Sequence, residues 1–272
     1  MVKGCIFRDY QASELQKAKL SVNIRLMQKT QNKADLKDKN EVTSVEDMFV
    51  AGAHYGYSKT RRHPSVSTYI HTTKNKTDII DLEKTSVLLE EAKNYAKSLG
   101  AGHKTILFVG TKPEAKEAVK SAAEALNMPY VTERWIGGTL SNFVEIKKHI
   151  AELENYKKES AVGGLEKYTK KERVVLAKKM EKLARYYTGL LGLKKSPEAL
   201  FIVDGKEEKI AQTEAMKSDT KVIALLNSDS NIKGIDFPII GNDGAIPSIK
   251  LFVNAIADAY KEGTMSVQQK EV

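Results

Sequence analysis

The chain has 272 residues, 41% of them hydrophobic and 29% charged, which is typical of a protein that folds around a core and not of a disordered one. No apolar run approaches the about 20 residues of a membrane-spanning helix, the N-terminus lacks the apolar core of a secretory signal, and the single cysteine, Cys5, excludes an internal disulfide. Lysine and arginine (44 residues) exceed aspartate and glutamate (35), and the net charge of +9 favours a polyanionic partner.

The first 40 residues carry nine basic and four acidic side chains and few apolar ones. Apart from a helix suggested around Ser13 to Met27, they show no clean hydrophobic period. We predict a basic, flexible N-terminal extension over residues 1–40.

The segment between Asp47 and Asp78 contains no acidic residue. It contains five cationic side chains, which are Lys59, Arg61, Arg62, Lys74 and Lys76. Basic side chains without neighbouring acids suit phosphate contacts, because each neutralised phosphate releases condensed counterions. The alternative is a solvated loop in which basic residues have gathered by chance.

From about residue 66 onwards, short β-like runs alternate with helical patterns. The clearest strand, Thr105–Gly110, is a continuous apolar run that ends in glycine, and Pro113 opens the helix that follows. The predicted strands are 67–71, 77–80, 105–110, 129–132, 199–204, 222–226 and 237–240. The predicted helices are 82–99, 113–126, 207–217 and 245–261. This alternation predicts an α/β fold, a doubly wound parallel sheet of the flavodoxin or Rossmann type.

Residues 141–190 break the alternation. One apolar stripe runs at helical spacing from Phe143 to Leu153, and another runs from Leu176 to Tyr187. Two narrow stripes with charged flanks, and the pair Gly163-Gly164 between them, predict an inserted antiparallel coiled-coil helical hairpin. Twelve basic and seven acidic residues lie in this segment, so together with the first 40 residues it accounts for the whole excess of positive charge.

The predicted domains follow from these patterns. The α/β domain comprises residues 41–140 and 191–265, with the hairpin of residues 141–190 inserted into it. Residues 266–272 form a short tail, and no internal repeat is present.

Nucleotide-binding motifs are the first alternative to test for a parallel α/β sheet. The best strand is followed by Gly110-Thr111-Lys112, whereas the dinucleotide fingerprint needs three glycines. The stretch from Ser98 to Thr105 ends like a P-loop but precedes its strand. Five histidines are scattered without metal-ligand spacing, and no nucleophile motif is present. We therefore predict no enzyme, no catalytic residue, no cofactor and no metal.

Three further features allow two interpretations each. Gly137-Gly138 either cradles a phosphate ahead of a helix or reverses the chain, and we favour the reversal. Trp135 either stacks on a base or anchors the core, and Asp204 is either a functional acid or a turn former and helix cap. For both residues the structural interpretation is favoured.

Six motifs occur in an order that is characteristic of one family. They are Ala51–Gly56, Ile79–Thr85, Leu107–Lys112, Arg134–Phe143, Ala199–Asp204 and Pro238–Asp243. The block Arg-Trp-x-Gly-Gly-x-Leu-x-Asn-Phe is the most specific of them. From about Val45 to Gly263 the chain resembles the second protein of the bacterial small ribosomal subunit, the S-two family.

The resemblance implies an α/β body with a coiled-coil hairpin, no catalysis, and assembly with small-subunit ribosomal RNA and neighbouring ribosomal proteins, including the messenger-RNA-capturing S-one protein. The single cysteine favours a reducing compartment, so a cytoplasmic ribosome is expected, with an organellar one as the alternative, and no membrane partner is expected. The chain departs from the family pattern in residues 1–40, at Tyr57, at Arg62-His63, in residues 227–230, and at Gly244 and Pro247.

We therefore predict a structural constituent of the small ribosomal subunit that binds RNA. The predicted RNA-binding residues are Lys59, Arg61, Arg62, Lys74, Lys76, Arg134, Lys147 and Lys148. RNA shape would supply specificity, because side chains cannot read the deep major groove of an A-form helix. The rival interpretations are a small-molecule enzyme or nucleotide-binding protein with a pocket at the strand ends, and a free RNA-binding chaperone.

Overall fold

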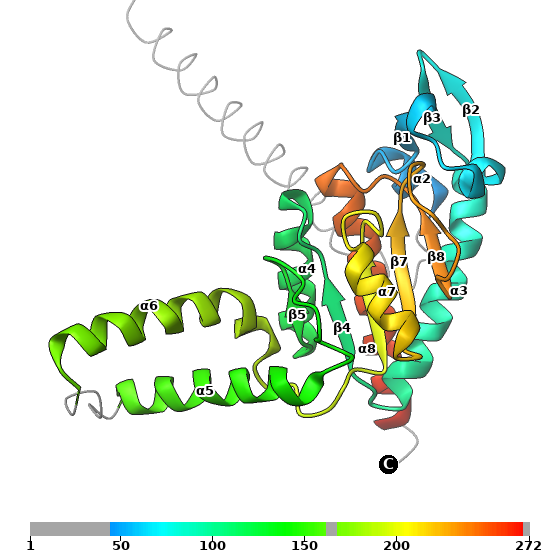
Figure 1. Ribbon diagram of the computed structural model, residues 1–272. Helices are drawn as coiled ribbons and strands as arrows, with labels where there is room; N and C mark the ends of the chain where they lie inside the picture. Colours follow the sequence, from blue (N-terminus) through cyan, green and yellow to red (C-terminus); the bar gives the residue numbers. More distant parts are fainter. Residues whose placement is uncertain (1–43, 162–167, 269–272) are drawn as a thin grey trace, which may run out of the picture. The chain divides into compact units, whose positions relative to one another are not determined.

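The computed structural model describes residues 44–161 and 168–268, and every structural statement below concerns these residues (Figure 1). They form a three-stranded and a five-stranded sheet. The antiparallel sheet has the order β1-β3-β2 and consists of β1 (Tyr55–Ser58), β2 (Ile70–Lys74) and β3 (Thr77–Ile80). The parallel sheet has the order β5-β4-β6-β7-β8 and consists of β4 (Ile106–Val109), β5 (Tyr130–Val131), β6 (Ala199–Val203), β7 (Lys221–Leu226) and β8 (Phe237–Ile240).

Seven α-helices are described. They are α2 (Val45–Val50), α3 (Leu82–Ala101), α4 (Pro113–Leu126), α5 (Phe143–Ala161), α6 (Lys170–Tyr187), α7 (Lys209–Lys217) and α8 (Ile246–Gln268). Short 3-10 helices η1 (Lys59–Arg61) and η2 (Pro64–Tyr69) lie between β1 and β2, and η4 (Thr188–Leu190) lies between α6 and β6. None of the helices in the described part of the chain has the length and apolar character needed to cross a bilayer.

The strand order confirms the predicted doubly wound sheet. The chain starts the sheet at β4, adds β5 on one side, and then returns to add β6, β7 and β8 on the other. Sharp helix ends separate the strands. The side chain of Asp81 accepts a hydrogen bond from the Glu83 amide at the start of α3, and Asn127 ends α4 in the left-handed conformation (φ 53°).

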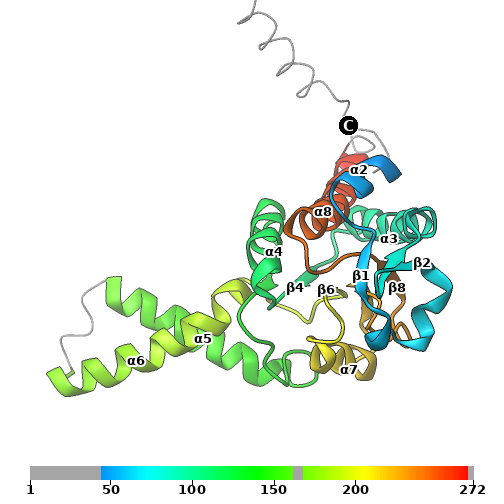
Figure 2. The same ribbon diagram turned by 90° about the horizontal axis from the view of Figure 1, so that it is seen from above.

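Alternate side chains of the buried strands pack into two cores, one on each face of the sheet. Phe108 and Phe201 point to the core beneath α3, α4 and α8, whereas Leu107 and Ile202 point to the core beneath α7 and the inner sides of α5 and α6. Figure 2 shows these two groups of helices on opposite sides of the strands. Burial on both faces explains why the strands read as continuous apolar runs.

Helices α5 and α6 occupy the segment predicted to form a hairpin. Their predicted apolar stripes include the buried residues Ile146, Ile150, Leu153, Met180 and Tyr187. The two helices contact each other, with an ion pair between Lys179 and Glu152. Because the connecting residues 162–167 lie outside the described part of the chain, the antiparallel coiled coil stays a prediction.

The structure corrects the start of one predicted strand. The predicted strand 67–71 is wrong in its first half, because residues 67–69 belong to the 3-10 turn that Pro64 opens, and the strand begins at Ile70. The predicted extension 1–40 lies outside the described residues.

Helices α3 and α8 approach so closely that only glycine fits where they cross. A Cβ atom on Gly100 of α3 would lie 2.2 Å from the carbonyl oxygen of Tyr260, and one on Gly263 of α8 would lie 2.1 Å from that of Lys97. These distances are below any normal contact, so backbone meets backbone at this crossing.

We expect Gly100→Ala to lower the free energy of unfolding by about 1–3 kcal/mol, because overpacking forces two long helices apart. Gly102→Ala is the matched control, since the nearest atoms to a Cβ there belong to the flexible side chain of Lys104, at 3.4 Å or more. Urea titrations followed by circular dichroism compare the two variants. Equal stability of both would contradict the close crossing.

Candidate nucleic-acid interface

Five of the eight predicted RNA-binding residues lie in the strands, turn and 3-10 helix of the segment that forms the three-stranded sheet. Strands β2 and β3 are joined by the two-residue turn Asn75-Lys76, whose φ angles are 50° and 65°. Positive φ at both positions is the conformation that suits the twist of a two-residue β-hairpin, and asparagine tolerates it well. Residues 71–76 are all exposed, so β2 and the turn present a solvent-facing arm.

Three lysines gather at the end of this arm. The backbone amide of Lys59 in η1 donates to the carbonyl oxygen of Lys76 at 2.9 Å, and Lys74 pairs with Thr77 across the turn. All three lysines are exposed, and among the described residues none of them has a carboxylate oxygen within 4.0 Å, although the charge of Lys59 helps to lower the pKa of Asp78. We call Lys59, Lys74 and Lys76 the basic arm.

Arg62 points into the protein. Its Nε donates to Asp78 Oδ2 at 2.6 Å, and its Nη2 binds Asp78 Oδ1 and the Thr73 hydroxyl. Asp78 is fully buried, and its hydrogen bonds with Arg62 keep its pKa below the ordinary value despite burial. The guanidinium group of Arg62 therefore neutralises a buried carboxylate of the same sheet.

Arg61 is neither as free as the three lysines nor as tightly paired as Arg62. Its guanidinium carbon is 4.9 Å from the centre of the Tyr57 ring, and its Nη2 is 3.8 Å from Asp229. The side chain keeps 56% of its exposure, so it remains accessible to an anion. The stacking on Tyr57 fixes the direction in which Arg61 points.

The other three predicted residues lie on different elements. Arg134 is exposed just after β5, and Lys147 and Lys148 are exposed on α5. Lys148 forms an exposed ion pair with Glu145 at 2.8 Å. The structure thus separates the predicted set into the three-stranded sheet, the end of β5, and α5.

The Gly137-Gly138 segment is a chain reversal, as favoured from the sequence. Gly138 has a φ of +95°, which a residue with a side chain rarely adopts. The amides of Leu140 and Ser141 both donate to Glu214 Oε1 at 2.9 Å. These amides would have to bind the phosphate in the alternative interpretation, and the carboxylate of Glu214 already occupies them.

Glu214 is a structural residue that the sequence did not reveal. Its other carboxylate oxygen accepts a hydrogen bond from Trp135 Nε1 at 2.9 Å. Trp135 is only 6% exposed, which confirms that it anchors the core. Burial alone would raise the pKa of Glu214, but the hydrogen bonds from Ser141, Trp135 and Leu140 outweigh it and lower the pKa.

A second unpredicted cluster lies at the carboxyl ends of the parallel strands. Lys112, just after β4, places its Nζ 2.8 Å from Asp204 and 2.9 Å from Asp243, and donates to the Tyr57 hydroxyl at 3.1 Å. Asn227 donates to the remaining oxygen of Asp243 at 2.8 Å. These polar groups converge at the switch point of the sheet, where α/β proteins usually bind ligands. Here they bind one another.

The ionisation of this cluster follows from its contacts. Burial alone would lower the pKa of Lys112, but its hydrogen bonds and the charges of both aspartates raise it well above the ordinary value. Burial and the neighbouring charge of Asp204 raise the pKa of Asp243, whereas the bonds from Lys112 keep that of Asp204 low despite burial.

Asp204 is also the turn former expected from its position after β6. Its Oδ1 accepts hydrogen bonds from the amides of Lys206 at 2.9 Å and Glu207 at 3.3 Å, and its φ is 67°. Within the described residues no three histidine, cysteine or acidic side chains are grouped so that they could bind a metal ion.

Replacing Lys112 with methionine leaves two buried carboxylates without their counter-ion. We expect a loss of about 3–5 kcal/mol in the free energy of unfolding at neutral pH. Because the folded-state pKa values of Asp204 and Asp243 would then lie above their unfolded values, the loss should shrink below about pH 4 and grow as the pH rises. Urea titrations at several pH values measure it.

Lys116→Met, in the first turn of the helix α4 that follows Lys112, is the matched control. Lys116 forms a half-exposed pair with Glu133, so its removal should cost less than about 1 kcal/mol. Equal losses for the two variants at every pH would show that Lys112 does not neutralise the cluster.

Comparisons with known proteins agree with the motifs in the sequence. The family model described as "Ribosomal protein S2" matches residues 48–263. The "Small ribosomal subunit protein uS2" of Wolinella succinogenes is 41% identical over 222 residues, which are 82% of this chain and 82% of that protein. The family match extends across the three-stranded sheet and the parallel sheet. The chain therefore belongs to the ribosomal protein S2 family.

Proposed function

We propose that this chain is a structural constituent of the small ribosomal subunit, where it binds ribosomal RNA and neighbouring ribosomal proteins without a catalytic role. The observation that carries the proposal is the family match over residues 48–263. The chemistry of the strand ends supports it, because the polar groups at the switch point neutralise one another and are not free to bind a substrate.

The basic arm is the proposed first RNA contact. Its three lysines are exposed, close together, and not paired with acids in the described part of the chain. An ammonium group on a flexible stem interacts with phosphate as a point charge and needs no fixed geometry. Such an arm would follow the backbone of folded RNA by its shape and charge.

The remaining predicted residues contribute beside this arm or on a second surface. Arg61 keeps an exposed guanidinium beside Lys59, whereas Arg62 stabilises the sheet that carries the arm. Lys147, Lys148 and Arg134 would contact RNA on a separate surface. The exposed pair between Lys148 and Glu145 is worth little in water, so Lys148 can exchange its partner for a phosphate.

The proposal extends to the predicted domains and partners. Residues 141–190 would form the inserted hairpin, whose exposed lysines and glutamates suit protein as well as RNA neighbours. The messenger-RNA-capturing S-one protein is among the expected neighbours where it is present, and the ribosome would be cytoplasmic or organellar.

Sedimentation tests the proposal directly. We expect the full chain, expressed with a small tag in cells, to co-sediment with small ribosomal subunits on a sucrose gradient at physiological salt. The tag alone serves as the control. A chain that stays at the top of the gradient, under conditions in which other small-subunit proteins enter the particle, would contradict the proposal.

The basic arm has its own test. The triple variant Lys59→Gln, Lys74→Gln, Lys76→Gln should bind small-subunit RNA more weakly. Its affinity should also depend less on salt, so that the negative slope of log affinity against log salt concentration becomes shallower by about two. The matched control replaces the exposed lysines Lys104, Lys217 and Lys250 with glutamine, which changes the net charge equally. Arg62 is kept, because its loss would leave the buried carboxylate of Asp78 without its counter-ion. The same slope in both triple variants would remove the arm from the interface.

A further inference from the structure

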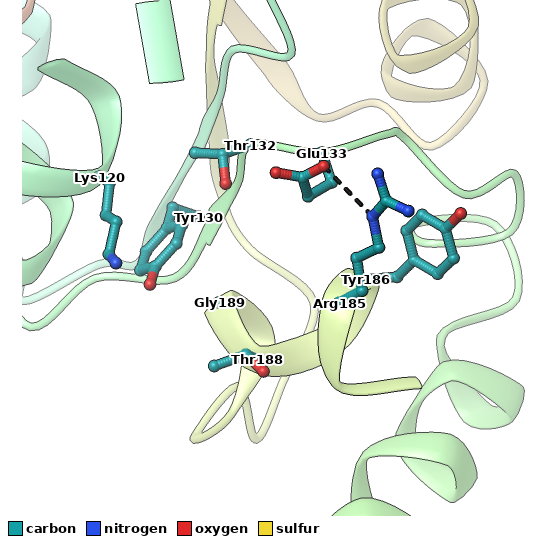
Figure 3. Close-up of a pocket in the computed structure, with 8 residues that line it drawn as sticks. All are labelled: Lys120, Tyr130, Thr132, Glu133, Arg185, Tyr186, Thr188 and Gly189. Carbon is teal, nitrogen blue, oxygen red and sulfur yellow. Dashed lines mark ion pairs between the residues drawn. The ribbon is translucent and has the colours of Figure 1, made fainter. Parts of the chain in front are cut away.

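A polar pocket of about 370 Å³ lies at the edge of the parallel sheet, away from the basic arm (Figure 3). It is lined by residues of α4, β5, the segment after β5, α6 and η4, namely Lys120, Tyr130, Thr132, Glu133, Arg185, Tyr186, Thr188 and Gly189. Its volume is near the lower end of the range of small-ligand sites, roughly 300–1,000 Å³. Arg134, a predicted RNA-binding residue, directly follows Glu133 in the chain.

Close packing of η4 on strand β5 fixes the floor of this pocket. A Cβ atom on Gly189 would lie 2.2 Å from the carbonyl oxygen of Tyr130 and 2.7 Å from its ring, so only glycine allows this approach. The Tyr130 hydroxyl donates to Glu124 of α4 at 3.1 Å, which fixes the ring from the other end. The aromatic ring of Tyr130 is therefore in place before any ligand arrives.

The cations around the pocket are also oriented in advance. Glu133 binds Lys116 at 2.9 Å and Arg185 at 3.5 Å, and hydrogen bonds with these two cations keep the pKa of Glu133 below its ordinary value. Arg185 remains 66% exposed and Lys120 remains 56% exposed, so both can still meet an anion. Figure 3 shows Tyr130 and Lys120 on one side of the pocket and Arg185 and Tyr186 on the other.

We propose that this pocket receives one unpaired nucleotide of RNA. A base would stack on Tyr186 with the ring of Tyr130 on its other side, and Arg185 and Lys120 would bind the flanking phosphates. Glu133, Thr132 and Thr188 would supply hydrogen-bond partners for the edge of the base. Unpaired bases that stack on aromatic side chains are the usual targets of sequence-specific RNA recognition.

A neighbouring hollow favours a nucleotide within a strand. It measures about 960 Å³, shares Tyr130, Thr188 and Gly189 with the smaller pocket, and also includes Lys194 and Lys195. An RNA chain could therefore continue beyond the bound nucleotide along a surface that offers further cations. An acidic peptide would use the same cations, but it would not require two aromatic rings.

Ultraviolet cross-linking of intact small subunits tests whether the pocket binds a nucleotide. This inference rests on the proposed function, because the subunit supplies the RNA. We expect a nucleotide adduct on Tyr130 or Tyr186 in subunits that carry this chain, identified by mass spectrometry of the digested protein. The adduct should disappear in Tyr186→Ala subunits that still contain the chain. Adducts only at other residues, or a peptide of a neighbouring protein cross-linked at the pocket, would overturn the inference while the proposed function stands.

Binding of hexauridylate to the purified full-length chain separates the two proposals. Tyr186→Ala should weaken binding at least about fivefold, because stacking on an aromatic ring is lost, and Tyr186→Phe should stay within about twofold. Arg185→Gln should weaken it more than Lys250→Gln, the same charge change on α8. If the chain never enters subunits, the proposed function fails and these affinities decide the pocket alone. Equal affinities of Tyr186→Ala and the unchanged chain would overturn it.

Discussion

One partly buried ammonium group joins the parts of this protein. Lys112 follows the first strand of the parallel sheet, β4, and binds Asp204 after β6 and Asp243 before α8. Its hydrogen bond to Tyr57 of β1 ties the three-stranded sheet to the same point. Two carboxylates this close cannot both remain ionised in a poorly solvated site without a cation between them. The strand ends, the last helix and the small sheet consequently depend on a single side chain.

Apolar patterns could be predicted from the sequence far better than polar partnerships. The strands β4, β6 and β7 were located to within one or two residues, because a strand buried on both faces consists of consecutive apolar side chains. Strand β1 was missed, because its Tyr-Gly-Tyr-Ser sequence is half-exposed and its place depends on β3. Gly56 allows that approach, since a Cβ atom there would lie 3.1 Å from the carbonyl oxygen of Asp78.

The candidate site shows the same limit. An acid-free run of residues predicted the basic arm, but the acid that ends the run, Asp78, neutralises Arg62 from within the folded sheet. Glu214 fills the amides of the Gly-Gly reversal in a similar way, 73 residues from Ser141. Charge density is visible in a sequence, whereas pairing between distant residues is a property of the fold. In both places a carboxylate of the chain itself occupies cationic or amide groups that RNA would otherwise meet.

The crossing of α3 and α8 can form only late in the synthesis of the chain. Helix α3 ends at Ala101 and α8 begins at Ile246, so the two glycine-lined surfaces are separated by most of the described chain. At a synthesis rate of about 5–20 residues per second, α3 waits on the order of ten seconds for its partner to be synthesised. One core of the sheet stays open throughout that interval, and the nascent chain would be most exposed to aggregation and to chaperone binding just before its last helix emerges.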